Sequence, residues 1–113
     1  MRIAFLTLGC KLNYAETSTY ERGFTANGLE VVPWEEQADV YLINTCSVTE
    51  RAEKKCRNVI RKMHRTSPGA RIIVTGCYAE LRRNDLLAID GVSLVFGAKE
   101  KSRVVPDTME LIL

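Results

Sequence analysis

The sequence lacks the features that would place it in several common classes. Its apolar runs are far shorter than the roughly 20 residues that cross a bilayer, and 27% of its residues are charged. The apolar stretch at 3–8 is too short for a secretory signal and is soon followed by Lys11. Neither a GxGxxG nor a P-loop motif of nucleotide binding is present. We therefore expect a cytoplasmic protein without a membrane partner.

The charge balance and the length exclude little more. The net charge of +2 is too small by itself to indicate a nucleic-acid partner. The 113 residues suffice for one domain with its own core, and the 46% hydrophobic content argues against disorder. What remains distinctive is a set of four cysteines. Because cytoplasmic thiols stay reduced, cysteines in special positions are more often metal ligands or nucleophiles than disulfide partners.

A buried strand is predicted at 39–44, where four consecutive apolar residues suit a strand covered on both faces. Ser47 and Glu50 have the spacing of a capping box, which predicts that a helix starts there. Cys46 then lies in a tight turn between strand and helix. Open parallel sheets bind their ligands in turns of this kind.

The same layout occurs twice more. Predicted strands at 3–8 and 71–75 are followed by Gly9-Cys10 and Gly76-Cys77, each just ahead of a predicted helix. Glycine before a cysteine permits a sharp bend and the close approach of a bulky group to the backbone. Cys10, Cys46 and Cys77 are therefore in equivalent positions.

The order of predicted elements indicates an α/β fold. Further strands are expected at 29–32 and 92–96, and helices at 13–27, 48–65, 79–89 and in pieces after 97. This alternation predicts a three-layer domain with a mainly parallel five-stranded sheet in the flavodoxin-like or Rossmann-like order 2-1-3-4-5. In that order the strands before the three cysteines are neighbours. At ~4.8 Å between strands the three turns span ~10 Å, so the three thiols could reach one small inorganic body.

Two interpretations of the three cysteines are open. Free cysteines are often small residues packed in turns. Alternatively, helix N-termini and backbone N–H groups favour the thiolate, which binds iron or zinc. Three equivalent placements favour a shared site. Structural zinc and simple clusters usually have four protein ligands, so three ligands leave a metal position open, which indicates chemistry rather than structure.

Two other residues are weighed as ligands and set aside. Cys56 lies ten residues after Cys46 along a helix, ~15 Å away, on the predicted apolar stripe, and is interpreted as a core residue. His64 lies near the end of the same helix among basic residues, where we expect it to be exposed to solvent. The stripe formed by positions 51, 54, 55, 58, 61, 62 and 65 is basic except for Asn58. It is either a solvated face or a face that contacts nucleic-acid phosphates.

Two alternative functions are considered. Cys77 and Arg83 have the Cys-x5-Arg spacing of a phosphatase loop, in which a thiolate attacks a phosphate held by backbone N–H groups and an arginine. This segment has no internal glycine, and Glu80 would repel the phosphate. The other alternative is a non-catalytic binding module stabilised by zinc.

Three segments carry a family resemblance: residues 8–13 (LGCKLN), 44–49 (NTCSVT) and 74–80 (VTGCYAE). Together they resemble the N-terminal domain of radical-SAM methylthiotransferases. The forms CKLN and GCYAE are most similar to the branch that acts on threonylcarbamoyl-adenosine in tRNA. The branches acting on isopentenyl-adenosine or on a ribosomal protein are less similar. The resemblance implies that Cys10, Cys46 and Cys77 hold an auxiliary [4Fe-4S] cluster with one iron not bound by protein, which carries the transferred sulfur.

The resemblance also implies parts that this sequence does not contain. In the family a separate radical-SAM domain binds S-adenosylmethionine and a second [4Fe-4S] cluster through Cys-x3-Cys-x2-Cys, and an RNA-binding domain usually follows. Neither is found in residues 1–113, which end on apolar 111–113. We therefore expect 1–113 to be an auxiliary-cluster domain cut from a longer enzyme. It should be inactive alone, be monomeric, work with its own radical-SAM domain, and meet tRNA mainly through the missing domains.

Overall fold

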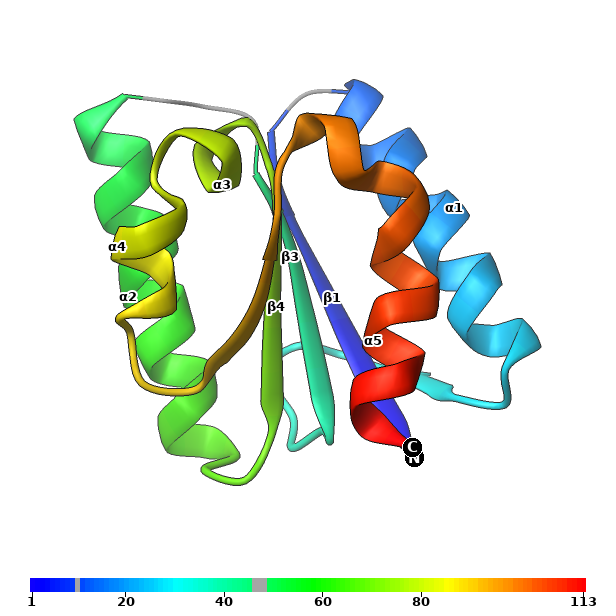
Figure 1. Cartoon of the computed structure of the whole chain (residues 1–113). Coiled ribbons are helices and arrows are strands. Elements are labelled where there is room, and N and C mark those ends of the chain that lie inside the picture. The colour runs from blue at the N-terminus through cyan, green and yellow to red at the C-terminus, as the bar shows by residue number, and fades with distance from the viewer. Residues whose placement is uncertain (10, 46–48) are drawn as a thin grey trace.

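Five parallel strands form one sheet in the order β2-β1-β3-β4-β5 (Figure 1). The structure is a computed structural model, and it describes residues 1–9, 11–45 and 49–113. The strands are β1 (Arg2–Leu8), β2 (Glu30–Val32), β3 (Val40–Thr45), β4 (Arg71–Gly76) and β5 (Val92–Phe96). The predicted three-layer fold and the predicted strand order are both confirmed.

Helices cover both faces of this sheet (Figure 1). The helical segments are α1 (Lys11–Ala26), α2 (Glu50–Thr66), α3 (Cys77–Leu81), α4 (Arg83–Leu87), the 3-10 helix η1 (Ala98–Arg103) and α5 (Val104–Ile112). Helices α2, α3 and α4 lie on one side, and α1, η1 and α5 lie on the other. None of the described helices is long and apolar enough to cross a membrane.

The two faces of the sheet bury separate apolar clusters because successive strand residues point to opposite sides. On the α2 side, Tyr41 and Ile43 of β3 pack with Ile60 of α2. On the α1 side, Leu42 packs with Phe24. All of these side chains are fully buried, so β3 is covered on both faces, as its continuous apolar run predicts.

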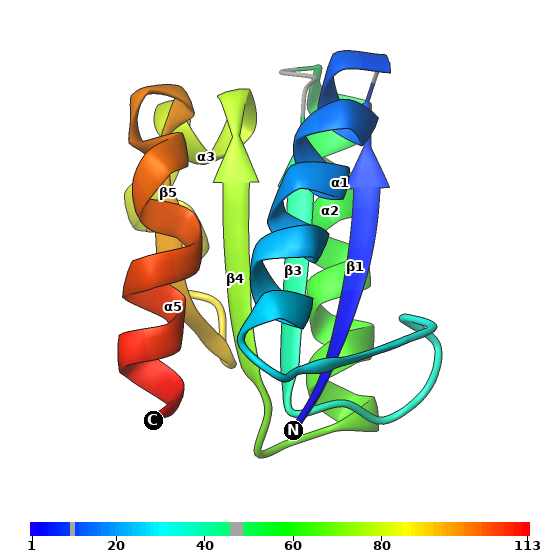
Figure 2. The same cartoon turned by 90° about the vertical axis from the view of Figure 1, so that its right-hand side faces the viewer.

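The carboxyl ends of the three central strands coincide. Leu8 of β1 pairs with Thr45 of β3, and Thr45 pairs in turn with Gly76 of β4. Figure 2 shows these strands ending at the same edge of the molecule. We call this edge the carboxyl edge. It is the place where an open α/β sheet offers a ligand site.

Two predicted helix starts are wrong. Helix α1 begins at Lys11, two residues before the predicted cap Asn13, and the buried side chain of Asn13 bonds to Asn44 of β3 instead of capping the helix. Helix α2 begins at Glu50 rather than at 48, and its N-cap is Thr49, whose side chain accepts a bond from the Ala52 N–H at 3.2 Å. Ser47, the predicted cap, lies outside the described residues.

The helix predicted at 79–89 is in fact two short helices, α3 and α4. Arg82 between them has φ −126° and ψ 36°, which is not helical. The following Asn84 and Asp85 have low propensity for helix interiors and favour helix starts, so the break falls where intrinsic preference is weakest. Tyr78, Ala79 and Leu86 are nevertheless buried against the sheet.

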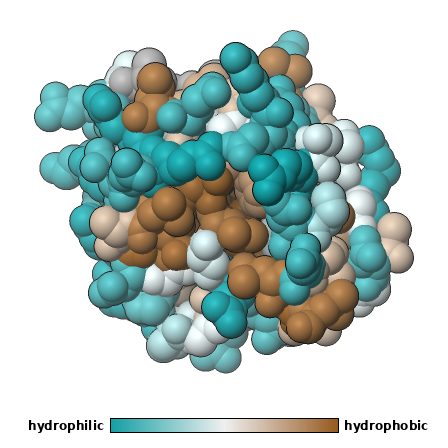
Figure 3. All heavy atoms as spheres, in the orientation of Figure 1, coloured by the Kyte–Doolittle hydropathy of each residue, from teal (hydrophilic) through white to brown (hydrophobic). Residues whose placement is uncertain are grey.

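Strand β5 forms one edge of the sheet and is only partly covered. Val92 and Leu94 are half-buried, while Leu87 of α4 is 45% exposed. Figure 3 shows apolar side chains gathered over β5 and over the end of α5. This apolar face is the largest one visible in that view.

Candidate cysteine site at the carboxyl edge

Cys77 is the one predicted ligand that the structure describes, and its thiol is exposed at the carboxyl edge. It is the first residue of α3 and directly follows Gly76 of β4. Cys10 and Cys46 lie outside the described residues. Among the described residues no group of three metal-binding side chains comes together.

The residues that lead to the three cysteines are nevertheless aligned. Leu8, two positions before Cys10, is paired with Thr45, and Thr45 directly precedes Cys46. Thr45 is also paired with Gly76, which directly precedes Cys77. The chain therefore reaches the three cysteine positions from adjacent strands at one level of the sheet.

Gly76 has backbone geometry that only glycine adopts without strain. Its φ is +111°, and a Cβ added here would lie 1.8 Å from the Thr45 carbonyl oxygen. The end of β4 is therefore held tightly against the end of β3. The Thr45 hydroxyl adds a bond by donating to the Thr75 carbonyl oxygen at 3.1 Å.

A pair of buried amides joins α1 to the end of β3. The Asn13 amide donates to the Asn44 Oδ1 at 3.0 Å, and the Asn44 amide donates to the Asn13 carbonyl oxygen at 3.0 Å. Asn13 lies three residues after Cys10, and Asn44 lies two residues before Cys46. The two bonds therefore tie together the segments that carry these cysteines.

The same network continues through hydroxyl and charged groups. The hydroxyls of Thr7 and Thr17 are 2.8 Å apart, and Thr17 also accepts a bond from the Asn44 amide at 3.3 Å. Glu16 of α1 forms an ion pair with Lys101 of η1. These groups fill the space between α1, the strand ends and η1 with satisfied polar side chains.

Lys101 brings a positive charge to this edge. The hydrogen bond to Glu16 raises the pKa of Lys101 above its ordinary value, with burial opposing the shift. Cys77 contributes a smaller electrostatic effect to the raised pKa of Lys101.

Cys56 is a core residue, as predicted. It is buried in α2 among the apolar side chains of one cluster. Burial raises the pKa of its thiol to about 12, with Arg57 opposing the shift. At neutral pH this thiol stays protonated, which makes it unsuitable as a metal ligand.

The expected exposure of His64 is wrong. Its ring is half-buried, and Nδ1 is buried without a hydrogen-bond partner among the described residues. The ring packs against Gly91, where an added Cβ would come within 2.7 Å of Nδ1. Gly91, which directly precedes β5, has no side chain and so leaves space for the His64 ring. This tertiary contact is not revealed by the helix pattern.

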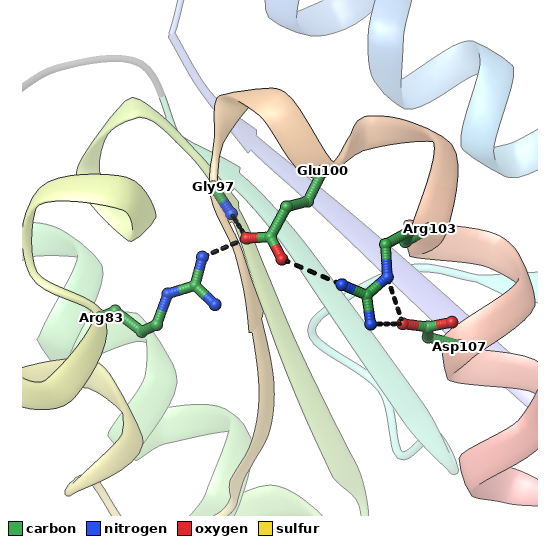
Figure 4. A network of polar contacts seen from close by, with 5 residues as sticks. All are labelled: Arg83, Gly97, Glu100, Arg103 and Asp107. Carbon is green, nitrogen blue, oxygen red and sulfur yellow. Dashed lines mark hydrogen bonds and ion pairs between the residues drawn. The ribbon is translucent and has the colours of Figure 1, made fainter.

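Arg83, the arginine of the phosphatase alternative, is engaged elsewhere. Figure 4 shows its guanidinium directed at Glu100, with which it forms an ion pair. The same carboxylate accepts a bond from the Gly97 N–H at 2.9 Å and lies 3.5 Å from Arg103. The Arg83 bond is the largest cause of the lowered pKa of Glu100. Because the Arg83 guanidinium is paired with Glu100, it is not available to bind a phosphate, which argues against the phosphatase interpretation.

Sequence reasoning missed the polar network at the carboxyl edge. Its members are Thr7, Asn13, Glu16, Thr17, Asn44, Thr45, Thr75 and Lys101. The sequence feature that could have predicted this network is the polar end of two apolar strands, Asn44-Thr45 and Thr75. In the strand pattern these polar residues indicate only where each strand ends. Asn13 was assigned to a cap, which is the commoner local use of asparagine.

Comparison with known proteins gives a consistent result. A family model described as "Uncharacterized protein family UPF0004" matches residues 2–97. Threonylcarbamoyladenosine tRNA methylthiotransferase MtaB of Bacillus subtilis (strain 168) is 44% identical over 103 residues, which are 91% of this chain and 23% of that protein. MtaB of Aquifex aeolicus (strain VF5) is 40% identical over 105 residues, 93% of this chain and 26% of that protein.

A relative named for a different substrate matches more weakly. The tRNA-2-methylthio-N(6)-dimethylallyladenosine synthase of Fervidobacterium nodosum is 31% identical over 109 residues, 96% of this chain and 24% of that protein. The chain therefore spans about a quarter of the length of the curated relatives that it matches. Its similarity is that of an MtaB-like N-terminal domain.

Proposed function

The chain belongs to the family described as Uncharacterized protein family UPF0004, and from this membership we propose that it is the auxiliary iron–sulfur domain of a tRNA methylthiotransferase. The proposed ligands are Cys10, Cys46 and Cys77. The observation that carries the proposal is the register that aligns Leu8, Thr45 and Gly76 at the carboxyl edge, with an exposed thiol directly after Gly76.

The described residues fit a thiolate-bound cluster. Adjacent strands are ~4.8 Å apart. Three chain segments that leave neighbouring strands at one level can therefore supply sulfur ligands to a single small cluster. Thiolates are the usual ligands of iron–sulfur clusters. Because Gly76 carries no Cβ, the end of β4 can lie against the Thr45 backbone of β3, which brings the residues just before Cys46 and Cys77 close together.

The residues of this chain have distinct roles in the proposal. The three cysteines bind, and the Asn13–Asn44 bonds hold the first two cysteine segments at a fixed spacing. Lys101 of η1 is paired with Glu16 of α1 and is proposed to offset part of the negative charge that thiolates would bring to the edge. Three protein ligands leave one metal position free for an exchangeable group. In the family, the bound [4Fe-4S] cluster supplies an open iron that carries the sulfur to be transferred.

The rest of the reaction is assigned to parts outside this chain. We propose that a radical-SAM domain of the same polypeptide supplies S-adenosylmethionine and a second [4Fe-4S] cluster, and that further segments bind the tRNA. The apolar face over β5 is a candidate contact for that domain because exposed apolar patches usually mark interaction sites. The proposed substrate position is C2 of a modified adenosine, N6-threonylcarbamoyladenosine 37 by similarity to the MtaB relatives. A cytoplasmic location and a monomeric isolated domain belong to the same proposal.

Anaerobic reconstitution with iron and sulfide tests the ligand assignment. The chain should bind about four irons, and Cys10→Ala, Cys46→Ala and Cys77→Ala should each lose the iron and the broad visible absorption. Cys56→Ala is the matched control, since its buried thiol should not contribute. Full iron content in any of the first three variants would count against the assignment.

Two further results would redirect the proposal. Zinc binding without any iron-dependent absorption would favour the zinc-stabilised binding module. Formation of methylthio-adenosine by residues 1–113 alone, with tRNA, S-adenosylmethionine, sulfide and a reductant, would show that no radical-SAM domain is needed. We expect no such product.

A further inference from the structure

A basic groove runs along the exposed side of α2. It has a volume of about 480 Å³ and is lined by Trp34, Arg51, Lys54, Lys55, Asn58 and Lys62, with Val59 beneath them. We call this surface the α2 groove. Trp34 comes from the segment between β2 and β3, so the groove joins two parts of the chain that are distant in sequence.

The charge of the α2 groove is uncompensated. Arg51, Lys54, Lys55 and Lys62 are exposed, and none of them forms an ion pair within the described part of the chain. The acidic Glu53 of the same helix pairs with Arg57 and Arg82 instead. Arg61 and Arg65 extend the exposed basic stripe beyond the groove. A surface of one sign without internal partners attracts an extended polyanion.

The spacing of the charges suits a linear partner. Arg51 and Lys62 are 11 positions apart on one helix, which corresponds to a distance of ~16 Å along its axis. Lys54 and Lys55 lie one turn after Arg51, and Asn58 takes the place of a cation in the turn before Lys62. Cations distributed along one helix face in this way can contact phosphates of a nucleic-acid backbone.

Trp34 distinguishes this surface from a plain basic face. The Lys62 ammonium lies 5.3 Å from the centroid of the indole ring, in a cation–π contact. The ring is only half-buried. A base can replace Lys62 on the ring, because base–aromatic stacking is stronger than an exposed cation–π contact, and the displaced ammonium is then free for a phosphate.

We propose that the α2 groove binds a single-stranded segment of RNA, with phosphates on Arg51, Lys54 and Lys55 and one base stacked on Trp34. Proteins that bind single strands combine these two features, a basic groove and an aromatic platform. A lipid surface does not fit, because the apolar side of α2 is buried against the sheet and cannot insert into a membrane. An acidic protein segment would use the cations but would gain nothing specific from the indole.

The position of the α2 groove relates it to the cysteine site. Arg51 is two residues after the cap Thr49, at the end of α2 that lies beside the carboxyl edge (Figure 1). The groove therefore begins at the same end of the molecule as the carboxyl edge. The inference goes beyond the proposed cluster, because neither the groove residues nor the RNA contact requires a metal.

Fluorescence anisotropy with a mixed-sequence RNA of about 12 nucleotides tests the inference on the 113-residue chain. Lys54→Ala with Lys55→Ala should weaken binding at least about tenfold at low salt and flatten the slope of log K against log salt by about 1.4, or about 0.7 for each lost phosphate contact. Trp34→Ala should weaken binding about tenfold with a nearly unchanged slope, and Trp34→Phe should restore most of the affinity.

Matched controls separate this result from bulk charge and from the cluster. Arg22→Ala with Arg71→Ala removes the same charge from exposed positions outside the groove and should change the affinity by less than about twofold. The groove variants should keep the iron content of the unchanged chain. An equal loss in the Arg22/Arg71 variant would overturn the proposal. So would displacement of the RNA by polyglutamate as effectively as by unlabelled RNA, which would indicate an acidic protein partner.

Discussion

Within strands β3 and β4, the buried residues before the carboxyl edge and the last two residues differ sharply in chemistry. Val40–Ile43 and Ile72–Val74 are apolar, whereas the last two positions of each strand are Asn44-Thr45 and Thr75-Gly76. Asn44 and Thr75 are each only 1% exposed, like the apolar residues before them. Burial therefore does not distinguish the apolar region from the polar region. The two regions differ in the groups that their side chains contact.

The apolar region is held by packing against helices on both faces, and the polar region is held by specific hydrogen bonds. Buried polar groups without partners would cost more than apolar ones, so they persist only where each is satisfied. The amide pair of Asn13 and Asn44 shows this arrangement. We therefore expect changes at the polar end to disturb the proposed cysteine site more than changes in the apolar region do.

Gly76→Ala should have the largest effect on this polar end. The added Cβ would overlap the Thr45 carbonyl oxygen in a backbone with positive φ, and we expect a loss of about 4 kcal/mol in the free energy of unfolding, together with loss of iron binding. Urea denaturation measures the first. Gly69→Ala is the control, since open space surrounds that glycine, and it should change stability by less than about 0.5 kcal/mol.

Ile43→Ala probes the apolar region one residue before the polar end. Its side chain is fully buried, and truncation leaves a cavity, so we expect a loss of about 3 kcal/mol. The iron content of the folded fraction should remain normal, because packing at this position does not set the spacing of the cysteine segments. A selective loss of iron with unchanged stability would erase the distinction between the two regions. Val31→Ala, at an exposed position of β2, is the stability control.

Asn44→Ala should lower the free energy of unfolding less than Ile43→Ala does, but it should weaken iron binding more. Removing one amide leaves the buried Asn13 amide without its Asn44 acceptor, which corresponds to about 2 kcal/mol. Combining it with Asn13→Ala should cost less than the sum of the two single changes, because both members of the pair are then absent. Reconstituted iron should be lost more readily from these variants than from Ile43→Ala. Strictly additive effects would show that the amides do not act as a pair.

The smallest effect concerns the Glu100 network beside the carboxyl edge. Arg83 and the Gly97 N–H hold the pKa of Glu100 below its ordinary value of 4.5. The unfolded chain therefore takes up this proton at a higher pH than the folded one, so stability is full above pH 4.5 and falls as the pH drops through the folded pKa. Because the network is partly exposed, its contribution should stay below about 1 kcal/mol. Glu100→Gln should flatten the dependence of the free energy of unfolding on pH in this range. An unchanged dependence would show that the network does not contribute to stability.

The sheet could be predicted from sequence because each strand is defined by a local pattern and its order follows from the alternation with helices. Cys56 and the exposed basic face of α2 were predictable for the same reason, since helical spacing separates buried from exposed positions. The roles of Asn13, His64 and Arg83 were not predictable. Each is decided by a contact with a distant residue, namely Asn44, Gly91 and Glu100. Local preferences favoured a cap for Asn13 and an exposed ring for His64, and they gave Arg83 an anion-binding role only in the disfavoured phosphatase alternative.

Iron-edge anomalous diffraction from anaerobically reconstituted crystals tests the central claim most directly. The account predicts one compact group of iron peaks at the carboxyl edge, bonded to the Sγ atoms of Cys10, Cys46 and Cys77, with one iron free of protein ligands. Iron located elsewhere, or the three sulfur atoms directed to separate places, would contradict it.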